Sequence, residues 1–385
     1  KVQLGHSDLM VTIACLGTMT WGEQNTEIEA FEQLDWAVHE AGINFIDTAE
    51  LYPVPPRPDT AGSTEVIIGK WLAKGGLELR KKIILASKVA GYSKGRGYLV
   101  EKRRETLGTE MGDASSFATH LSKVQIFEAV DASLKRLQTT YLDLYQLHWP
   151  ERYTPVFGEL SYKRASERAD AVTIEEQVAA IGELVKSGKV RYWGLSNENA
   201  FGVTKFVHAC EKLGVPLPVS IQNDFAFVDR RFEQDGTAEA CAPHNVGANG
   251  IGLLAYGALA GGTLSGKYAD AAGTAQVETS RHAKFPDFQP RYHANSTLEL
   301  SAEFAKVAKK YGLKPAQLAL AWAAAKEYMG SVIIAATTMQ QLKENVAAFD
   351  VSIPEECATE LEKLYLNYER PYFANVGRMG RNNPY

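Results

Sequence analysis

Short apolar runs alternate with amphipathic stretches along the chain, from about residue 11 to residue 350. A short apolar run bounded by turn residues is typical of a buried strand, whereas apolar residues at every third or fourth position are typical of a helix. On this basis we expect strands at residues 10–16, 43–48, 83–87, 141–149, 190–196, 219–223, 252–256 and 331–336. Each of these runs leads to a helical pattern, so the chain repeats one strand–helix unit.

The helical patterns complete this repeat. We expect helices at residues 27–41, 63–75, 123–138, 173–186, 200–213, 296–311, 314–326 and 339–349, and a further one at 354–367. Eight strands that each lead to a helix fit a closed (β/α)8 TIM barrel better than an open doubly wound sheet. No Gly-x-Gly-x-x-Gly motif follows the first strand, which argues against a Rossmann fold. We therefore predict one domain over residues 1–385, with the barrel at about 11–350 and a C-terminal helix and extended tail at 351–385.

Three long irregular stretches interrupt the pattern, at residues 91–122, 150–172 and 268–295. Each follows an expected strand and precedes a helix, so in a barrel all three lie at the C-terminal face. Loops of this length are usually functional, and barrel active sites are built at that face. The helix that begins near Ser63 is expected to end at Gly75-Gly76.

Composition narrows the class of protein. The formal net charge is -5, with 41 basic and 46 acidic residues, so we expect no nucleic-acid partner. No apolar run approaches the roughly 20 residues that span a bilayer, so we expect no membrane segment. Four cysteines (Cys15, Cys210, Cys241 and Cys357) are scattered without metal spacing, as in reduced cytoplasmic proteins. Because residue 1 is Lys, a removed organelle-targeting segment stays open, and the oligomeric state is not readable.

Reactive side chains close three successive apolar strands. Asp47 ends the second strand, Lys88 ends the third and His148 ends the fourth, while Tyr52 follows Asp47 by five residues. Strand ends of a parallel barrel meet at one mouth, so we expect an acid, a phenol, an amine and an imidazole there. Each residue taken singly is more often a cap or a surface residue, and it is their conjunction that indicates a site.

This set suits the reduction of a carbonyl group. A phenol with a pKa of about 10 is a weak acid, and a nearby ammonium lowers that pKa. Lys88 is expected to do this for Tyr52, with Asp47 holding Lys88 charged and oriented. His148, as a neutral donor, is expected to polarise the carbonyl oxygen. The hydride must come from a cofactor, because no side chain supplies one.

The same segments resemble the aldo-keto reductase family. They are Asp47-Thr48-Ala49-Glu50-Leu51-Tyr52, Ser87-Lys88-Val89, Leu147-His148-Trp149, Gly194-Leu195-Ser196-Asn197 and Ile221-Gln222-Asn223, in the family's order. The long inserts, with residues 137–143 and 336–339, look most like the Tas-type branch, which is related to potassium-channel β-subunits. The resemblance covers nearly the whole chain, and it implies an NADP(H)-dependent enzyme that reduces aldehydes or ketones.

The resemblance also implies a cofactor site. Ser196, Asn197 and Gln222 would hold the nicotinamide carboxamide, and Tyr256 would stack on the ring. The phosphates would lie on the segment Gly257, Ala258, Leu259, Ala260 and Gly261, with Lys267, and the adenosine on Gln341, Glu344 and Asn345. Where several branches carry a lysine for the 2′-phosphate, this chain has Ala335 and Ala336. A preference for NADP over NAD would then rest on Arg281, Lys267, Thr337 or Gln341.

Substrate contacts and two other functions stay open. Trp21 and Trp149 are candidates for the rim of the pocket. The basic residues Lys94, Arg96, Lys102, Arg103 and Arg104 of the first long loop suggest a negatively charged carbonyl substrate. The main alternative is an NADP(H)-sensing regulatory subunit with little turnover. A metal-dependent hydrolase is disfavoured because His148 lacks further histidines at strand ends, so we expect no metal.

Overall fold

The computed structural model describes residues 1–110, 117–157, 159, 161–247, 249–268 and 280–368. The chain divides into two compact units. The first comprises residues 1–224, 231–256 and 327–343, and the second comprises residues 225–230, 257–326 and 344 onward. The predicted extended tail, 369–385, lies outside the described residues, as do 111–116 and 269–279 of two long loops.

The first unit contains a closed barrel of parallel strands. Its strands are β3 (Ala14–Gly17), β4 (Phe45–Asp47), β5 (Ile84–Val89), β6 (Leu142–Leu147), β7 (Val190–Ser196), β8 (Ser220–Asp224), β9 (Gly252–Tyr256) and β10 (Met329–Ile334). They follow the chain order around the ring, and β10 pairs with β3 to close it. The strands consist largely of buried residues, which explains their continuous apolar runs. The predicted (β/α)8 barrel is confirmed.

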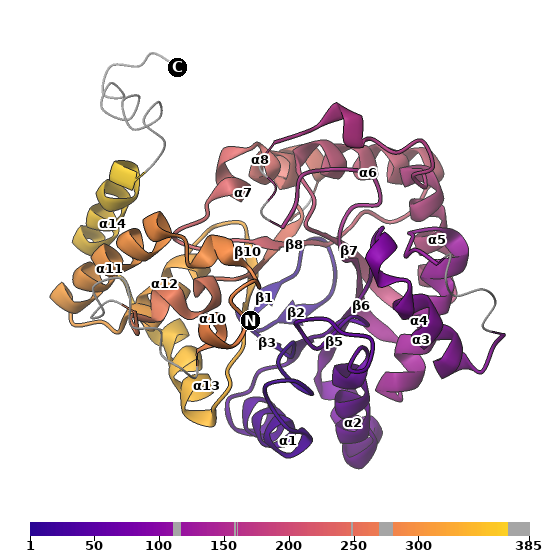
Figure 1. The fold of residues 1–385 in the computed structure, drawn as a ribbon, viewed down its shortest axis with the longest axis horizontal. Coiled ribbons are helices and arrows are strands. Elements are labelled where there is room, and N and C mark those ends of the chain that lie inside the picture. Colours follow the sequence, from indigo (N-terminus) through magenta and orange to yellow (C-terminus); the bar gives the residue numbers. More distant parts are fainter. Residues whose placement is uncertain (111–116, 158, 160, 248, 269–279, 369–385) are drawn as a thin grey trace. The chain divides into compact units, whose positions relative to one another are not determined.

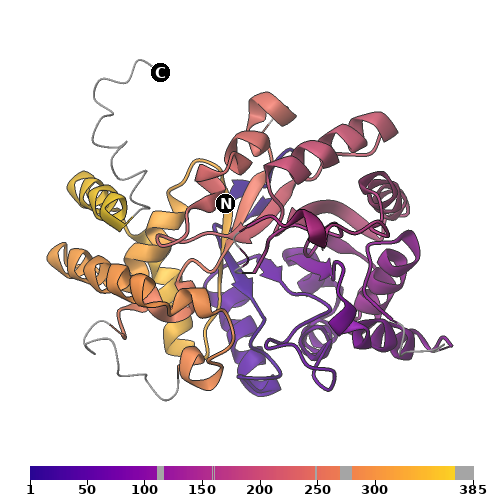
Figure 2. The same ribbon diagram turned by 45° about the horizontal axis from the view of Figure 1, so that its top comes forward.

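Helices cover the outside of these strands (Figures 1 and 2). They are α1 (Glu27–Asp35), continued by a π-helical turn η1 (Trp36–Glu40), α2 (Ser63–Lys82), α4 (Lys123–Leu137), α5 (Ile174–Lys186) and α6 (Ala200–Leu213). Shorter helices are α7 (Arg231–Gln234), α8 (Thr237–Cys241) and α9 (Pro243–Val246), and α13 (Met339–Val346) begins in this unit. The predicted end of a helix at Gly75-Gly76 is confirmed: Gly76, with φ of 64°, is non-helical, and a second helical segment follows it within α2 as far as Lys82.

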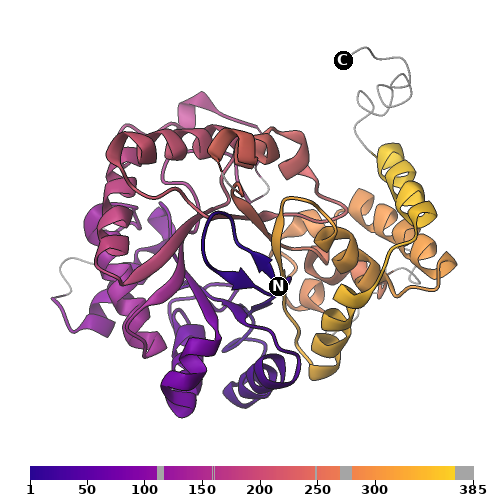
Figure 3. The same cartoon turned by 180° about the vertical axis from the view of Figure 1, so that it is seen from behind.

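A hairpin closes the amino-terminal end of the barrel, as Figure 3 shows from behind. Its strands β1 (Val2–Gln3) and β2 (Met10–Val11) pair antiparallel. Leu4 and Leu9 of this hairpin are buried in one apolar cluster with Phe45 and Leu144 of the barrel strands. The hairpin therefore fills the end of the barrel at which the strands begin, and the opposite end carries the polar strand ends.

The sequence predicted that the first long loop is irregular, and this prediction is wrong. It contains a 3-10 turn η2 (Lys94–Arg96) and helix α3 (Tyr98–Leu107). Ser93 and Thr119 exchange two backbone hydrogen bonds of 3.2 and 3.1 Å, which join the two sides of the loop. The second long loop contains one 3-10 turn, η4 (Arg164–Ser166).

The second unit is helical in its described residues. It contains η5 (Ala260–Ser265), α10 (Arg281–Lys284), η6 (Pro290–Tyr292), α11 (Asn295–Lys310), α12 (Pro315–Ala324), the last residues of α13, η7 (Ala347–Asp350) and α14 (Glu355–Tyr368). Phe225 stacks on Trp322 at 5.3 Å, and Phe227 packs on Phe304 at 4.7 Å. Phe225 thus has a packing role in this unit. No helix among the described residues of either unit is long and apolar enough to cross a membrane.

Candidate active site

Three of the predicted polar residues form one buried cluster. The ammonium of Lys88 lies 2.6 Å from Oδ2 of Asp47 and 3.3 Å from the hydroxyl of Tyr52. It also donates to the backbone carbonyl of Thr48 at 2.8 Å. The side chain of Lys88 is fully buried. A single ammonium therefore connects the carboxylate to the phenol, with each of its three protons directed at an oxygen.

The strand register brings these residues together. Asp47 at the end of β4 pairs with Ala86 of β5, and Lys88 follows two positions later on the same strand. Successive side chains of a strand point to opposite faces, so residues 86 and 88 share one face. Tyr52 comes from the turn after β4, where its N–H donates to the carbonyl of Ala49 at 3.1 Å. Two adjacent strands and one turn thus fix the cluster.

Two glutamine amides hold the other oxygen of Asp47. Gln222 donates to Oδ1 at 2.9 Å and Gln146 at 3.2 Å, and Gln222 also donates to Oε1 of Gln146 at 3.1 Å. Both amides are buried. Because both carboxylate oxygens have donors, the orientation of Asp47 beside Lys88 is fixed.

His148 lies beside this cluster. Its ring centre is 5.9 Å from that of Tyr52, at an interplanar angle of 77°. On the other side its ring is 5.0 Å from the ring of Trp149. Nδ1 of His148 is buried and has no hydrogen-bond partner among the residues that the structure describes. A buried polar atom of this kind is suited to a ligand.

Burial and charge set the protonation states of the cluster. Burial alone would lower the pKa of Lys88, but the neighbouring Asp47 and Tyr52 outweigh it and raise that pKa. Burial raises the pKa of Tyr52, and the charge of Lys88 offsets this only in part. The expected net lowering of the Tyr52 pKa is therefore wrong, because the loss of hydration outweighs the ammonium. Burial, followed by Lys88 and Arg96, lowers the pKa of His148 well below its usual range.

A second polar chain connects His148 to the next strands of the barrel. The Asn197 amide donates to the carbonyl of His148 at 2.7 Å, and its oxygen accepts from the Tyr256 hydroxyl at 2.6 Å. Ser196 donates to the carbonyl of Gln222 at 2.9 Å. Asn197 has a φ of 52°, a left-handed value that asparagine tolerates better than most residues. The four residues predicted to hold a nicotinamide are thus joined in one hydrogen-bond network. Within it, the side-chain amide of Gln222 donates to Asp47.

The segment predicted to bind the phosphates, Gly257–Gly261, belongs to the second unit, whereas Tyr256 belongs to the first. Gly257, Ala260 and Gly261 all have positive φ, with values of 75, 48 and 65°. Gly262 follows with φ of 104°, and a Cβ there would lie only 2.9 Å from Nζ of Lys267. The segment therefore presents its backbone in left-handed turns and keeps a lysine close. Ala258 is buried.

Two cations of this unit have no carboxylate partner among the described residues: Arg281 is half-buried, and Lys267 is more exposed. Burial, followed by the charge of Arg281, lowers the pKa of Lys267, and burial also lowers the pKa of Arg281. Nε of Arg281 has no hydrogen-bond partner in the described part of the chain. Two adjacent cations of this kind are suited to a polyanion such as a phosphate group. These residues fit a nucleotide cofactor.

The residues predicted for the adenosine are divided between the units. In the first unit, Oε1 of Gln341 accepts from both the N–H and the hydroxyl of Thr337 at 3.1 Å. In the second unit, Glu344 pairs with Lys314 at 3.0 Å, and Asn345 is buried. Each residue thus has a structural role within its own unit, and their contact with a cofactor stays a prediction.

Comparison with known proteins identifies the family. The model of the aldo/keto reductase family matches residues 14–366. This chain is an aldo/keto reductase. Protein tas of Escherichia coli K12 is 42% identical over 369 residues, covering 96% of this chain and 98% of its own length. The uncharacterized oxidoreductase YrpG of Bacillus subtilis is 32% identical over 363 residues, covering 94% of each chain.

A third relative supports the predicted branch. A putative voltage-gated potassium channel subunit beta of Schizosaccharomyces pombe is 27% identical over 349 residues, covering 90% of this chain and 87% of its own length. Together with the tas relative, it places this aldo/keto reductase in the Tas-like branch. The chain is accordingly an oxidoreductase by family.

The two tryptophans predicted at the rim of this aldo/keto reductase have different surroundings. Trp149 is 5% exposed, contacts His148 and donates from its indole to the carbonyl of Tyr92 at 3.0 Å. Trp21 is fully buried, and its indole donates to Gln33 of α1 at 3.2 Å. Trp149 therefore lies next to the reactive cluster, whereas the described contacts of Trp21 are those of a packing residue.

Sequence reasoning missed the roles of two buried residues of this aldo/keto reductase, Glu50 and Gln146, and misread a third, Arg103. Glu50, inside the Asp47–Tyr52 segment, accepts from Arg103 of α3 at 2.7 and 2.6 Å and from the N–H of Ala90 at 2.7 Å. Arg103 therefore anchors the loop helix, and its predicted attraction for a substrate anion is wrong. Gln146, the second missed residue, precedes His148 by two positions. The sequence offered a sign of Gln146, because a polar residue inside an apolar strand needs a buried hydrogen-bond partner.

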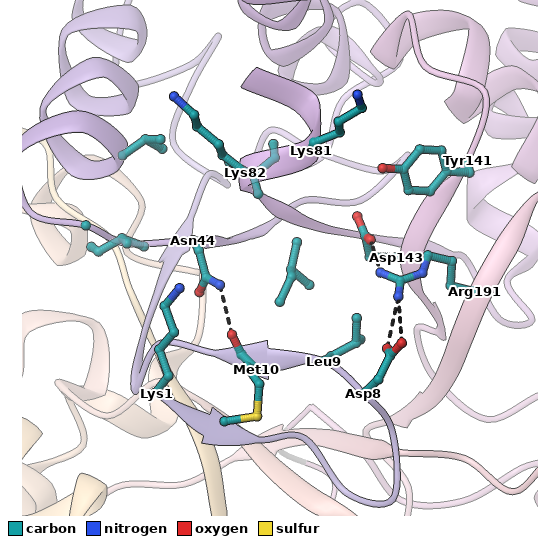
Figure 4. Close-up of a pocket in the computed structure, with 15 residues that line it drawn as sticks. Lys1, Asp8, Leu9, Met10, Asn44, Lys81, Lys82, Tyr141, Asp143 and Arg191 are labelled. Carbon is teal, nitrogen blue, oxygen red and sulfur yellow. Dashed lines mark hydrogen bonds and ion pairs between the residues drawn. The ribbon is translucent and has the colours of Figure 1, made fainter. Parts of the chain in front are cut away.

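A cavity of about 610 Å³ lies at the opposite end of the same unit (Figure 4). Asn44, Tyr141 and Asp143 line it, together with Arg191, which bridges Asp143 and Asp8. These residues lie at the amino ends of the strands whose carboxyl ends carry the reactive cluster. The cavity is therefore separate from the end of the barrel that carries the reactive cluster. Within the described residues, no group of three or more His, Cys, Asp or Glu could hold a metal ion.

Proposed function

We propose that this protein reduces aldehydes or ketones to alcohols with NADP(H), using Tyr52 as the proton donor. The observation that carries the proposal is the fully buried ammonium of Lys88, within hydrogen-bond distance of both Asp47 and Tyr52. Three apolar side chains of similar volume would stabilise the fold at least as well as this buried ion pair, so stability alone does not explain it. It does supply a proton donor whose conjugate base is stabilised by a fixed positive charge.

The protonation states favour this direction of chemistry. The raised pKa of Tyr52 keeps the phenol protonated at neutral pH, so its proton is available. As negative charge develops on a carbonyl oxygen, the phenol donates its proton, and Lys88 stabilises the phenolate that remains. Asp47 keeps Lys88 charged throughout. His148, neutral because of its lowered pKa, offers an N–H that orients the same oxygen.

The chain also has suitable groups for the cofactor. Ser196, Asn197, Gln222 and Tyr256 are proposed to hold the nicotinamide, with Gly257–Gly261 and Lys267 at the phosphates. When bound, the reduced nicotinamide supplies the hydride that side chains lack. Arg281 and Lys267, whose pKa values are both lowered by partial burial, support a preference for the additional phosphate of NADP(H). Thr337, Gln341, Glu344 and Asn345 are proposed for the adenosine end.

The substitution Tyr52→Phe tests this mechanism. It removes one hydroxyl, and we expect kcat for a panel of aldehydes with NADPH to fall by about 10² to 10⁴, the usual contribution of a general acid. Tyr162→Phe is the matched control, because that hydroxyl is exposed and bonds to Glu167. Full activity of Tyr52→Phe would contradict the mechanism. Equal rates with NADH and NADPH would contradict the cofactor preference alone.

A second function has one observation in its favour. The relative named a potassium channel subunit beta raises the possibility of a nucleotide-sensing partner protein. A stopped-flow measurement separates the two, since a reductase loaded with NADPH should oxidise it rapidly when a reactive aldehyde is added. If the loaded, folded protein gives no change in NADPH absorbance, the sensing function is favoured over the reductase.

A further inference from the structure

The basic side chains of the first long loop differ in what neutralises them. Arg103 is fully buried and bonded to Glu50, and Arg104 lies 3.4 Å from Glu128. These charges are compensated inside the protein. Arg96, in the turn η2 of the same loop, forms no ion pair with a carboxylate in the part of the chain that the structure describes. Its surroundings therefore need another explanation.

Arg96 lies near the reactive cluster. Its guanidinium carbon is 4.8 Å from the ring centre of Trp149. Trp149 in turn contacts His148, whose ring lies 5.9 Å from that of Tyr52. The cation is thus separated from the proton donor by two aromatic side chains. Its charge also reaches the site, because Arg96 is one of the groups that lower the pKa of His148.

This position is costly for an unpaired charge. Arg96 is partly buried, and burial lowers its pKa although the nearby Tyr98 acts in the opposite direction. Arginine stays protonated in proteins, so it cannot avoid the cost by losing its proton. Its contact with Trp149 recovers only about 0.5–2 kcal/mol, the range for such a cation over an aromatic ring. A desolvated cation beside a site is suited to an anion from outside the chain.

We propose that Arg96 binds the carboxylate of the substrate and selects oxo-carboxylates over neutral carbonyl compounds. This inference rests on the proposed reductase function and adds the substrate class. A planar guanidinium matches a carboxylate with two parallel hydrogen bonds. A guanidinium carries five N–H donors, and no carboxylate in the described part of the chain pairs with those of Arg96. The aromatic ring of Trp149 would flank the spacer between carboxylate and carbonyl.

A matched pair of aldehydes tests the selectivity. The probes are 4-formylbenzoate and 4-formylbenzamide, which share the ring and the aldehyde but differ in charge. For Arg96→Met we expect kcat/KM for the benzoate to fall about ten- to hundred-fold, the range for a hydrogen bond to a charged group. The value for the benzamide should change less than about three-fold. Lys102→Met, in the same loop and paired with Glu105 at the surface, removes an equal charge and should change neither value.

An equilibrium measurement tests the same contact without turnover. Calorimetric titration with 4-(hydroxymethyl)benzoate in the presence of NADP⁺ should show weaker binding to Arg96→Met by a similar factor. Arg96→Lys keeps the charge but not the planar fork, and it should retain part of the affinity. If Arg96→Met lowers kcat/KM equally for both aldehydes, Arg96 only packs on Trp149. If Lys102→Met lowers kcat/KM for the benzoate as selectively as Arg96→Met does, the selectivity comes from the overall positive charge of the loop and not from a contact with Arg96. Either result would overturn the inference.

The two proposals fail differently. If the wild-type protein reduces the benzamide but does not discriminate between the two aldehydes, the reductase function stands and the role of Arg96 falls. If neither aldehyde is reduced, the reductase function falls, and the titration still decides whether Arg96 binds a carboxylate.

Discussion

Removing the ammonium from the buried Asp47–Lys88 pair should destabilise the fold as well as abolish catalysis. The side chains of Lys88 and Asp47 are 0% and 2% exposed, so solvent does not screen the pair. Breaking such a pair by removing one partner typically costs about 3–5 kcal/mol, because it leaves a buried charge uncompensated. In Lys88→Met, Asp47 keeps the amide donors of Gln146 and Gln222. We therefore expect a loss near the lower end, about 3 kcal/mol in the free energy of unfolding.

Neutralising the remaining charge should recover stability without recovering activity. In the double variant Asp47→Asn/Lys88→Met, the carbonyl of the new amide can still accept from Gln222, and neither substituted position carries a charge. We expect the double variant to regain at least about 1 kcal/mol over Lys88→Met, since neighbouring residues of one network are strongly coupled. Reduction of an aldehyde should stay lost in both, because neither stabilises the phenolate of Tyr52.

Urea unfolding followed by circular dichroism measures this cycle, with initial rates recorded on the same samples. Lys81→Met is the control, because Lys81 is 68% exposed and its pair with Glu78 is a surface contact worth less than about 1 kcal/mol. If the double variant is no more stable than Lys88→Met, the loss is not the cost of an uncompensated carboxylate. If Lys88→Met keeps full turnover, the assigned role of Lys88 is wrong.

Two further predictions concern pH and cofactor choice. The pKa of His148 in the folded state lies well below 6.5, so as the pH falls below about 6.5 this side chain takes up a proton in the unfolded state before it does so in the folded state. The free energy of unfolding therefore decreases as the pH falls through this range. His148→Gln should flatten the dependence of unfolding midpoint on pH between about 6.5 and 4.5, and an unchanged slope would contradict the assignment. For Arg281→Met or Lys267→Met, we expect KM for NADPH to rise about ten-fold or more while KM for NADH changes little. Equal changes in KM for NADPH and for NADH would show that neither cation contacts the additional phosphate of NADPH.

The barrel and its catalytic strand ends could be predicted because both follow from local pattern. Asp47, Lys88 and His148 each close an apolar strand, and parallel strands in a closed barrel bring their carboxyl ends to one mouth. The distances between them, and the sign of the net Tyr52 shift, could not be predicted. They depend on how much water is excluded and on amides such as Gln146, which belong to the tertiary structure.

The loops were harder to interpret, because their order comes from contacts distant in sequence. Helix α3 has few apolar residues, and Arg103 within it pairs with Glu50, 53 positions away. A charged residue whose partner is that far away reads as a surface residue in the sequence. The same reasoning grouped Arg96 with Arg103 and Arg104, although only their partners distinguish them.

The two proposals assign chemistry and substrate choice to different parts of the first unit. Strand register fixes Asp47 and Lys88, so a change of loop sequence leaves the proton donor in place. Arg96 instead belongs to the first long loop, where its guanidinium lies over the ring of Trp149. Buried Glu151 connects the two long loops, because it accepts from the N–H of Leu121 at 2.8 Å and pairs with Arg168 at 3.3 Å. A relative that keeps the strand ends but lacks the cation at the position of Arg96 should thus reduce carbonyl compounds without preferring anionic ones.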